Sequence, residues 1–351
     1  MNSGNSASAT AYLVIGFGGK GVGDVVACTA FIRNLARNEP DSVIDFVVFS
    51  PVGVELLRQN PYVRNTYLLD MDYLRMGGRY SWREKLGYLR PFRRVRYDGC
   101  YVLSTKLRHA LFAFLTGARE RIGYANYHRG FLLTKTGREP LEKNVAERFL
   151  DLLGLDGKPI FDNHGEVFLS DREIAGAHRI LQEHGVSADD VVVALAPFAA
   201  DMRRTWGIDN FWEVARHFAG QGYKVLILGA SHDREKIESN PVPNAPEIVD
   251  LIGRLTILET AAAIRYSAVF LGNDSGLGHI AGAVGAKALV LGYEVTRVWY
   301  PIAPTVTTII KDTGCNGCNV QKCVGNSGAA PVCFSSIKAD EVVRTLTEIL
   351  A

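Results

Sequence analysis

Short runs of aliphatic, β-branched and aromatic residues alternate along the chain with longer segments in which apolar residues recur every three or four positions. The short runs predict strands and the longer segments predict amphipathic helices. In the first half we expect strands at residues 12–15, 43–49, 67–69 and 99–103, separated by helices at 24–37, 53–60 and 108–116. Because strand–helix alternation is typical of parallel sheets, this half predicts a doubly wound α/β domain.

The second half repeats the pattern. Its expected strands are residues 191–196, 224–229, 247–250, 268–271 and 288–291, its helices are 208–221, 233–239, 257–266 and 278–284, and a last helix is expected at 338–350. Between the halves, Gly157, Pro159 and Gly165 interrupt the periodicity, which places the join near residues 156–170. We therefore predict two Rossmann-like domains, 1–165 and 166–351.

Length, composition and charge narrow the function classes. A chain of 351 residues is long enough for two domains, and 47% hydrophobic with 22% charged residues is typical of a soluble globular protein. The net charge of +2 gives no overall attraction to nucleic acid, so nucleic acid is not an expected partner. Neither a signal peptide nor an apolar run of membrane-spanning length is recognisable, so we expect a cytoplasmic protein.

A glycine-rich segment follows the first expected strand and opens a helix. Gly16, Gly18 and Gly21 fit the GxGxxG pattern of dinucleotide-binding folds, which suggests an NAD-dependent oxidoreductase. That pattern also requires an acid at the end of the second strand, but this strand ends at Ser50 without one. A simpler interpretation is that the glycines allow a sharp turn and that Asp24 caps the helix.

A second turn of this kind lies at residues 270–285. An apolar run ends in the sequence Gly-Asn-Asp-Ser-Gly at 272–276, and a helical pattern follows. The first N–H groups of a helix have no intrahelical acceptor and lie at its positive dipole end, so this turn suits a phosphate. Asp274 lies inside the turn and suits a ligand that carries hydroxyls beside its phosphates, such as a sugar nucleotide.

Several motifs, taken in order, resemble glycosyltransferase family 9, the heptosyltransferases and their relatives. The likeness covers nearly the whole chain. It is carried by the segment Gly23-Asp24-Val25-Val26, by residues 118–123, by Arg204-Thr205-Trp206, by residues 272–276 with His279, and by the spaced cysteines near the C-terminus.

The resemblance implies a GT-B fold, in which two Rossmann-like domains face an interdomain cleft, and an inverting, metal-independent sugar transfer. The N-terminal domain would bind the acceptor hydroxyl, with Asp24 as general base. The C-terminal domain would bind the nucleotide sugar, most plainly ADP-heptose. The implied donor-binding residues are Arg204 and the backbone N–H groups of Ser275, Gly276 and Leu277 at the diphosphate, Asp233 at the ribose or base, Asp274 at the sugar, and His279.

Simpler structural roles compete with some of these assignments. Asp233 is as well placed to cap a helix, and His279 is as well explained as a packed core histidine. Ala30, Gly278 and residues 291–296 depart from the family pattern, and most of the departures lie along the expected donor pocket. These departures bear on the donor sugar and its nucleotide more than on the reaction type.

A basic and aromatic window lies at residues 73–97, where Glu84 is the only acid after position 72. One interpretation is a solvated helical face. The other is a surface for an anionic acceptor or for the inner face of the cytoplasmic membrane, where each basic residue adds about 1 kcal/mol. We favour the second interpretation and assign Lys20, Arg75, Arg79 and Arg83 to acceptor binding.

Four cysteines are clustered near the C-terminus. Cys315, Cys318, Cys323 and Cys333 have a spacing that can surround one tetrahedral metal, and a cytoplasmic chain favours metal over disulfides. Zinc and iron both accept four thiolates, and the alternative is four reduced thiols packed in a loop. A metal here would be structural because all four positions are filled, so no cofactor is expected for catalysis.

Overall fold

The computed structural model describes residues 9–19, 21–70, 73, 79–200, 205–293, 298–314 and 332–351. The chain divides into two compact units, unit 1 (Met1–Asn163) and unit 2 (His164–Ala351). No helix in the described ranges is both long and apolar enough to cross a membrane.

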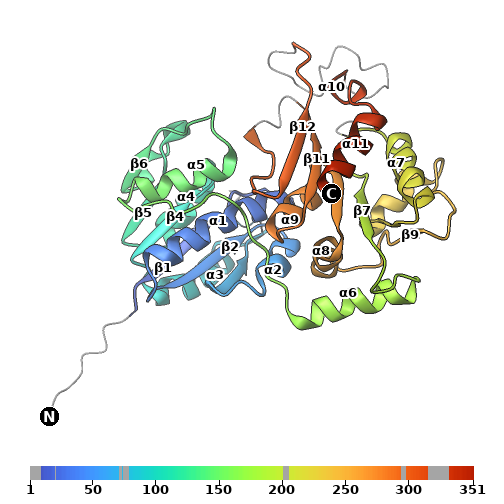
Figure 1. Cartoon of the computed structure of the whole chain (residues 1–351). Helices are drawn as coiled ribbons and strands as arrows, with labels where there is room; N and C mark the ends of the chain where they lie inside the picture. Colours follow the sequence, from blue (N-terminus) through green and yellow to red (C-terminus); the bar gives the residue numbers. More distant parts are fainter. Residues whose placement is uncertain are drawn as a thin grey trace. The chain divides into compact units, whose positions relative to one another are not determined.

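Unit 1 is a parallel sheet covered by helices on both faces (Figure 1). The strands lie in the order β3-β2-β1-β4-β5-β6, which is the 3-2-1-4-5-6 order of dinucleotide-binding folds. Its elements are β1 (Ala11–Ile15), α1 (Val22–Asn38), β2 (Val43–Val48), α2 (Pro51–Leu57), β3 (Val63–Leu68), α3 (Trp82–Val95), β4 (Gly99–Val102), α4 (Leu107–Thr116), β5 (Glu120–Tyr124), the 3-10 helices η2 (Asn126–His128) and η3 (Gly130–Leu132), β6 (Lys135–Gly137) and α5 (Val145–Gly154).

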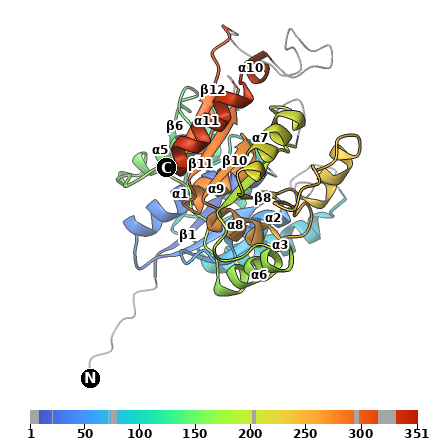
Figure 2. The same cartoon turned by 45° about the vertical axis from the view of Figure 1, so that its right-hand side comes forward.

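Unit 2 repeats this architecture. Its sheet order, β12-β11-β10-β7-β8-β9, becomes 6-5-4-1-2-3 when the strands are renumbered from β7, which is the same order read from the other edge. Figure 2 shows α11 beside the strands of this sheet, near α7. The elements are α6 (Asp171–Glu183), β7 (Val192–Ala196), α7 (Ile208–Gly220), β8 (Lys224–Ile227), the 3-10 helix η5 (Ser231–Ile237), β9 (Ile248–Asp250), α8 (Ile257–Tyr266), β10 (Val269–Asn273), α9 (Gly276–Ala283), β11 (Ala288–Gly292), β12 (Val306–Ile310), α10 (Val332–Ser335) and α11 (Ala339–Leu350).

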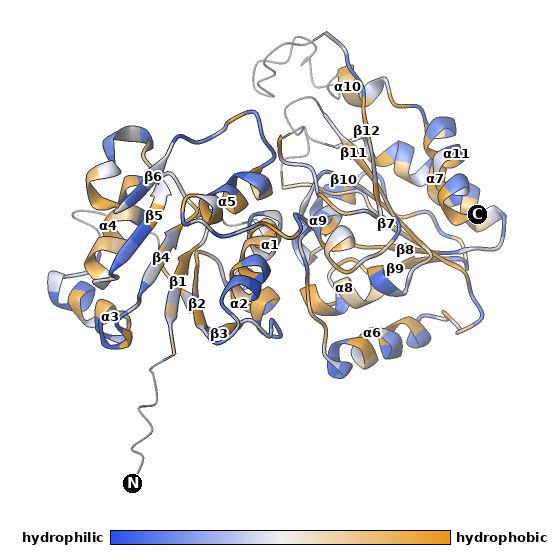
Figure 3. Ribbon diagram, turned by 60° about the vertical axis from the view of Figure 1, so that its left-hand side comes forward, coloured by the Kyte–Doolittle hydropathy of each residue, from blue (hydrophilic) through white to orange (hydrophobic). Residues whose placement is uncertain are grey.

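Each unit has its own apolar core, built around fully buried central strands. Every residue of β1, β4, β7, β10 and β11 is buried. In unit 2, Trp206 and Trp212 are each 1% exposed and pack in the core beside Phe211. Figure 3 shows α6 with hydrophobic and hydrophilic residues alternating along its length, as expected of an amphipathic helix.

The faces of the unit 1 sheet follow from the helix contacts. Helix α1 packs against α2 and α5, whereas α3 packs against α4. The α3–α4 contact is aromatic, since the rings of Phe92 and Phe112 meet edge to face at 5.2 Å and Tyr88 lies 6.3 Å from Phe112. The two helices therefore form a layer of their own.

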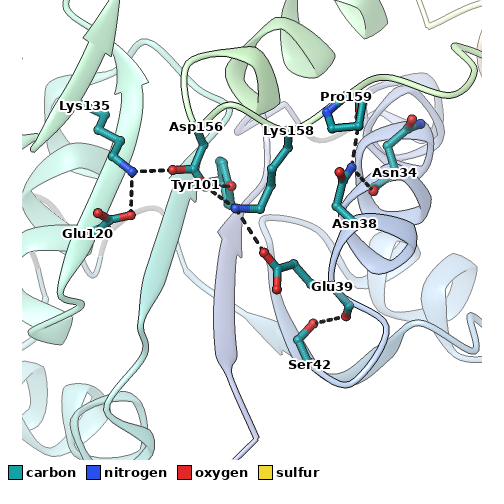
Figure 4. A network of polar contacts seen from close by, with 10 residues as sticks. All are labelled: Asn34, Asn38, Glu39, Ser42, Tyr101, Glu120, Lys135, Asp156, Lys158 and Pro159. Atoms are coloured by element: carbon teal, nitrogen blue, oxygen red, sulfur yellow. Dashed lines mark hydrogen bonds and ion pairs between the residues drawn. The ribbon is translucent and has the colours of Figure 1, made fainter.

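A polar network fixes the end of unit 1 (Figure 4). The buried carboxylate of Asp156 accepts hydrogen bonds from the Tyr101 hydroxyl at 2.6 Å and from Lys135 Nζ and Lys158 Nζ at 2.5 Å. Burial alone would raise the pKa of Asp156, but these three donors lower it. Further along the same segment, Asn38 Nδ2 donates to the Pro159 carbonyl oxygen at 2.9 Å. The segment after α5 is thus anchored to α1 and to the sheet.

The sequence prediction missed several elements. Strand β3 begins at Val63 instead of residue 67, and strands β5, β6 and β12 were not expected. Helices α3, α5 and α6 were also not assigned, although α6 begins with a capping box in which Glu173 accepts from the Ser170 N–H at 2.9 Å. The segment expected to form an α-helix from residue 233 is a 3-10 helix that begins at Ser231.

Candidate active site

Asp24 lies in the first turn of α1, beside the glycine-rich segment and at the carboxyl end of β1. The structure places it at the third helical position, where its Oδ2 accepts a hydrogen bond from the Gly21 N–H at 3.0 Å. It is therefore not the N-cap residue itself, because that position is Gly21. Burial raises the pKa of Asp24, against smaller opposing effects of the Gly21 N–H and the Lys106 ammonium.

The glycines beside Asp24 are required by close packing. A Cβ on Gly19 would lie 1.9 Å from the Asp24 carboxylate, and a Cβ on Gly18 would lie 2.3 Å from the ring of His109. Gly18 also has φ +87°, a conformation that favours glycine. The Asp24 side chain and the His109 ring thus pack against the glycines of this turn. A cavity of about 10 Å³ remains beside it.

Cationic side chains gather at the same edge of the unit 1 sheet. Strands β1 and β4 are neighbours in the sheet, but the chain continues from β1 to β2 on one side and from β4 to β5 on the other. This is the switch point of a doubly wound fold, where such folds bind ligands. Lys106 follows β4, and its Nζ donates to the Gly18 carbonyl oxygen at 3.2 Å. Arg129 is fully buried; its Nη1 donates to the Ser104 carbonyl oxygen, and its Nη2 has no hydrogen-bond partner.

Two more buried polar groups at this edge lack hydrogen-bond partners. Both ring nitrogens of His109 are unpaired, and so is Ser50 Oγ at the end of β2. Burial, with smaller effects of Arg108, Lys106 and Arg129, lowers the pKa of His109 to about 3. The sequence prediction missed this group of residues; the available signal was that Ser104 and Lys106 directly follow an apolar strand.

In unit 2, Asn273 organises the turn between β10 and α9. Its fully buried side chain accepts from the Trp206 N–H and donates to the Pro197 carbonyl oxygen, both at 2.9 Å. These bonds join the turn to the segment after β7, the neighbour of β10 in the sheet. The β7–β10 pair is the switch point of unit 2, equivalent to β1–β4 in unit 1.

The turn itself contains four of the expected donor-binding residues, Asp274 to Leu277, and His279 follows in α9. Ser275 is the N-cap of α9 and makes no side-chain capping bond, and the helix begins at Gly276, followed by Leu277. The first N–H groups of this helix therefore point toward a partly exposed turn.

Asp274 and His279 form a contact within that turn. His279 Nε2 lies 3.8 Å from Asp274 Oδ1, and both side chains are largely buried. Burial lowers the pKa of His279 to about 4, against a smaller effect of a hydrogen bond with the Trp299 backbone. His279 is therefore neutral at pH 7, and the 3.8 Å separation from Asp274 is neither a hydrogen bond nor an ion pair.

Asp233 occupies in η5 the position that Asp24 occupies in α1. Its Oδ2 accepts from the Ala230 N–H at 2.8 Å, and Lys236 Nζ donates to its Oδ1 at 2.6 Å. Lys236 also donates to the Ala199 carbonyl oxygen at 2.9 Å, which links η5 to the segment after β7. The capping interpretation of Asp233 thus agrees with its hydrogen bonds.

The remaining predicted site residues divide between described and undescribed parts of the chain. Arg79 donates to the carboxylate of Asp70, and the guanidinium of Arg83 lies 5.5 Å from the ring centre of Trp82. Cys333 is buried in the unit 2 core beside Phe334. Residues outside the described ranges are Lys20, Arg75, Arg204, Cys315, Cys318 and Cys323. The described ranges contain no group of three or more potential metal ligands.

Two Rossmann-like units with these strand orders define the GT-B class of glycosyltransferase fold. The fold predicted from the sequence is confirmed by the solved structure of a glycosyltransferase family 9 protein from Veillonella parvula DSM 2008, with a TM-score of 0.81 and 18% identity over 99% of both chains. The structure of Escherichia coli ADP-heptose lipopolysaccharide heptosyltransferase II is also similar, with a TM-score of 0.76 and 22% identity over 97% of this chain and 98% of that one.

The family follows from sequence comparison. Residues 87–327 match glycosyltransferase family 9 (heptosyltransferase), and the chain belongs to this family. Lipopolysaccharide heptosyltransferase 3 of Escherichia coli K12 is 26% identical to it over 293 residues, which cover 80% of this chain and 82% of the relative. The protein is therefore a glycosyltransferase, as its motifs predicted.

Proposed function

We propose that this glycosyltransferase moves a heptose from ADP-heptose to a hydroxyl group of a glycan or other acceptor, with inversion at the anomeric carbon and with Asp24 as the general base. The observation that carries the proposal is the partly buried Asp24 carboxylate at the switch point of unit 1, beside an unusual concentration of cations. The names of the relatives, which are lipopolysaccharide heptosyltransferases, support heptose as the transferred sugar and ADP-heptose as the donor.

The proposed step is a single displacement. The acceptor oxygen forms a bond to the anomeric carbon while its proton passes to Asp24, and the bond between that carbon and the phosphate oxygen breaks. ADP leaves with the electron pair of the broken bond. Because burial raises the pKa of Asp24 while the Gly21 N–H holds it in place, the carboxylate is both a stronger base and oriented.

In the proposed donor site, the diphosphate lies at the N-terminus of α9. The N–H groups of Ser275, Gly276 and Leu277 stabilise the leaving oxygens, as Arg204 does by a fixed charge. Asp274, which lies beside His279, binds hydroxyls of the sugar. Asp233 is the remaining donor contact in this proposal, at the ribose or the base, although its two carboxylate oxygens already accept bonds from Ala230 and Lys236.

The proposed acceptor side lies in unit 1. Lys106, Arg108 and Arg129 favour an acceptor that carries an anionic group near its reacting hydroxyl. The earlier assignment of Lys20, Arg75, Arg79 and Arg83 to acceptor binding stays a proposal, and the ion pair of Arg79 with Asp70 already compensates one of these charges. We place the reaction at the cytoplasmic side of the membrane, with peripheral contact to it.

The four cysteines are proposed to hold one structural zinc or iron ion, with no part in the transfer. Cys333, the one of the four in the described ranges, is buried in the unit 2 core. Elemental analysis of the purified protein should find about one equivalent of metal per chain, reduced in Cys333→Ser. A metal-free protein that is fully folded would remove this proposal.

The oxidoreductase alternative meets a physical obstacle at the glycine-rich segment. In dinucleotide-binding folds, the pyrophosphate lies at the N-terminus of the first helix. Here that N-terminus holds the carboxylate of Asp24, which already accepts the Gly21 N–H. A pyrophosphate at the same place would be repelled by this carboxylate.

The test of the proposed function measures donor binding and transfer separately. Calorimetry with ADP, UDP and GDP should show selective binding of ADP, and transfer from ADP-heptose to a deacylated lipopolysaccharide core should give a product of inverted configuration by NMR. Asp24→Asn should keep ADP affinity and lower the transfer rate by about 100-fold or more. Asp41→Asn, at an exposed carboxylate of unit 1, is the matched control.

Each outcome of this test has a defined meaning. Near-normal transfer by Asp24→Asn would remove the general-base role. Selective binding of UDP or GDP would overturn ADP-heptose as the donor while keeping sugar transfer, and a product of retained configuration would overturn the single displacement.

A further inference from the structure

Large apolar side chains are exposed on one layer of unit 1 to an extent not seen in the described part of unit 2. Six lie on α3 and α4: Trp82 is 67% exposed and Leu86 50%, and four more follow on α4. In unit 2, the described residues of this kind are Val191 and Val332. Single exposed apolar residues need no explanation, but a contiguous group marks an interaction surface.

The exposed residues of α4 form one stripe. Leu107, Leu111, Phe114 and Leu115 are 49%, 37%, 49% and 39% exposed, and they stand at positions i, i+4, i+7 and i+8 of the helix. That spacing places them on a single face. The opposite face is buried through Phe112, which packs on the α3 aromatics Tyr88 and Phe92. Figure 3 shows α4 coloured largely hydrophobic, beside α3.

Helix α3 adds cations to this surface. Trp82, Leu86, Arg90 and Arg93 recur at i, i+4, i+8 and i+11, so the two exposed apolar residues share a face with two arginines. The only acid of the helix, Glu84, is engaged in capping, because its Oε2 accepts the Ser81 N–H at 2.7 Å. Residues 81–121 together contain ten lysines and arginines against three acids.

The geometry points to the α3–α4 layer as a docking surface for a lipid bilayer whose headgroups are anionic. An apolar stripe flanked by arginines with long stems is how an interfacial helix pair engages such a surface, since the stems lie along the acyl boundary and the guanidinium groups reach the phosphates. A tryptophan at the start of α3 also suits the boundary between headgroups and acyl chains. Charge complementarity selects an anionic bilayer over a neutral one.

This docking surface deepens the membrane contact in the proposed function but does not depend on the transfer chemistry. The sequence analysis assigned a membrane contact to the basic window at residues 73–97. The structure adds α4, which carries four of the six exposed apolar residues of this surface. Asp24 lies on α1, which packs with α2 and α5. The first turn of α4 reaches the Asp24 site through His109 and the N-cap Lys106, whereas Leu111 and Leu115, which the test changes, lie on the exposed stripe.

The experiment uses the full chain and vesicles of phosphatidylcholine with 30% phosphatidylglycerol, compared with pure phosphatidylcholine, in sedimentation assays at ~0.1 M salt. We expect binding to the anionic vesicles only. Since each basic residue contributes about fivefold to partitioning, Arg90→Gln/Arg93→Gln should weaken binding about 25-fold. Leu111→Gln/Leu115→Gln should also weaken it at least tenfold. Matched controls on unit 2 are Arg216→Gln/Arg265→Gln and Val191→Gln, which should bind as the parent does.

Trp82 supplies an independent readout. It is exposed, whereas Trp206 and Trp212 are buried and Trp299 in unit 2 is half-buried. A blue shift of fluorescence on adding anionic vesicles should therefore disappear in Trp82→Phe and persist in Trp299→Phe. Equal binding to neutral vesicles, or no effect of the α3 and α4 variants relative to the controls, would overturn the inference. So would a dimer in ultracentrifugation that Leu111→Gln/Leu115→Gln breaks, because the surface would then join two copies of the chain.

Failure of this inference is distinguishable from failure of the proposed function. Transfer to a deacylated, water-soluble acceptor is measured without vesicles and should be unchanged in Leu111→Gln/Leu115→Gln. If the parent protein does not bind vesicles but transfers the sugar, only the docking surface is refuted. If it binds vesicles but transfers no sugar, only the proposed transfer is refuted.

Discussion

Buried His109 should make unit 1 sensitive to mild acid. Its side chain is fully buried, its ring stacks on Phe49 at 4.4 Å between ring centres, and both ring nitrogens lack partners. Burial lowers its pKa to about 3, while in the unfolded chain a histidine has a pKa of about 6.5. Between these values the unfolded state binds a proton that the folded state does not, so the folded state is stabilised above pH 6.5 and loses stability as the pH falls.

The magnitude follows from the linkage between pH and stability. From pH 7 to pH 5 an unfolded histidine gains nearly one proton while folded His109 stays neutral, which lowers the free energy of unfolding by about 2 kcal/mol. This figure holds for any folded pKa well below 5. At pH 4 the expected loss is about 3 kcal/mol.

The assay compares variants that cannot titrate at this position. His109→Phe keeps the stack on Phe49, and His109→Asn provides a smaller alternative in case Phe overfills the space beneath Gly18. Urea titrations read by hydrogen-exchange mass spectrometry on peptides of β1 and β4 report unit 1 alone. Whatever their stability at pH 7, the free energy of unfolding of both variants should fall by about 2 kcal/mol less than that of the parent between pH 7 and pH 5. The control His232→Gln changes an exposed side chain and should leave the profile unchanged.

One result would refute this reasoning. If the parent and both His109 variants lose stability in parallel between pH 7 and 5, then His109 accepts a proton in the folded state. An NMR titration provides the direct check, because the Cε1–H signal that is lost in His109→Phe should not shift between pH 8 and 5.

Three further predictions concern the turns and the base. Gly18→Ala should destabilise unit 1 by about 2 kcal/mol or more in urea titrations, since φ is +87° and the new Cβ would overlap a buried ring. Asn273→Ala should destabilise unit 2 by about 2–5 kcal/mol, because a buried N–H and a buried carbonyl lose their partners. Lys106→Met removes a charge that lowers the pKa of Asp24, so the acidic limb of the transfer rate should move to higher pH.

The parts of the fold that the sequence predicts are those whose pattern is local. β7 and β11 are buried along their whole length and are continuous apolar runs, which are recognisable without knowledge of their neighbours. β12 and β6 are edge strands that are only partly buried. Because they contain polar residues such as Thr307, Thr308 and Thr136, their pattern of apolar and polar positions resembles that of a loop. Helix α3 was hidden by its charge, since only Leu89 and Phe92 of its residues are buried.

The candidate site shows the same division. Asp24 and the 274–277 turn were predictable because each lies within one strand–turn–helix segment. Lys106 and Arg129 were missed because they reach the edge beside Gly18 from different segments. The pairing of β1 with β4 brings these segments together, and this neighbour relation cannot be read from periodicity.

The two switch points differ in a way that supports separate roles for the two units. In unit 1 the N-terminus of α1 already holds a carboxylate, Asp24, which accepts the Gly21 N–H. In unit 2 the N-cap Ser275 leaves the N-terminus of α9 without a side-chain cap, and Asp274 is turned toward neutral His279. A dianionic diphosphate is therefore repelled at α1 and attracted at α9. The same strand order thus places a carboxylate at the first helix of one unit and a helix N-terminus without a side-chain cap in the other, which is the difference that the proposed transfer requires.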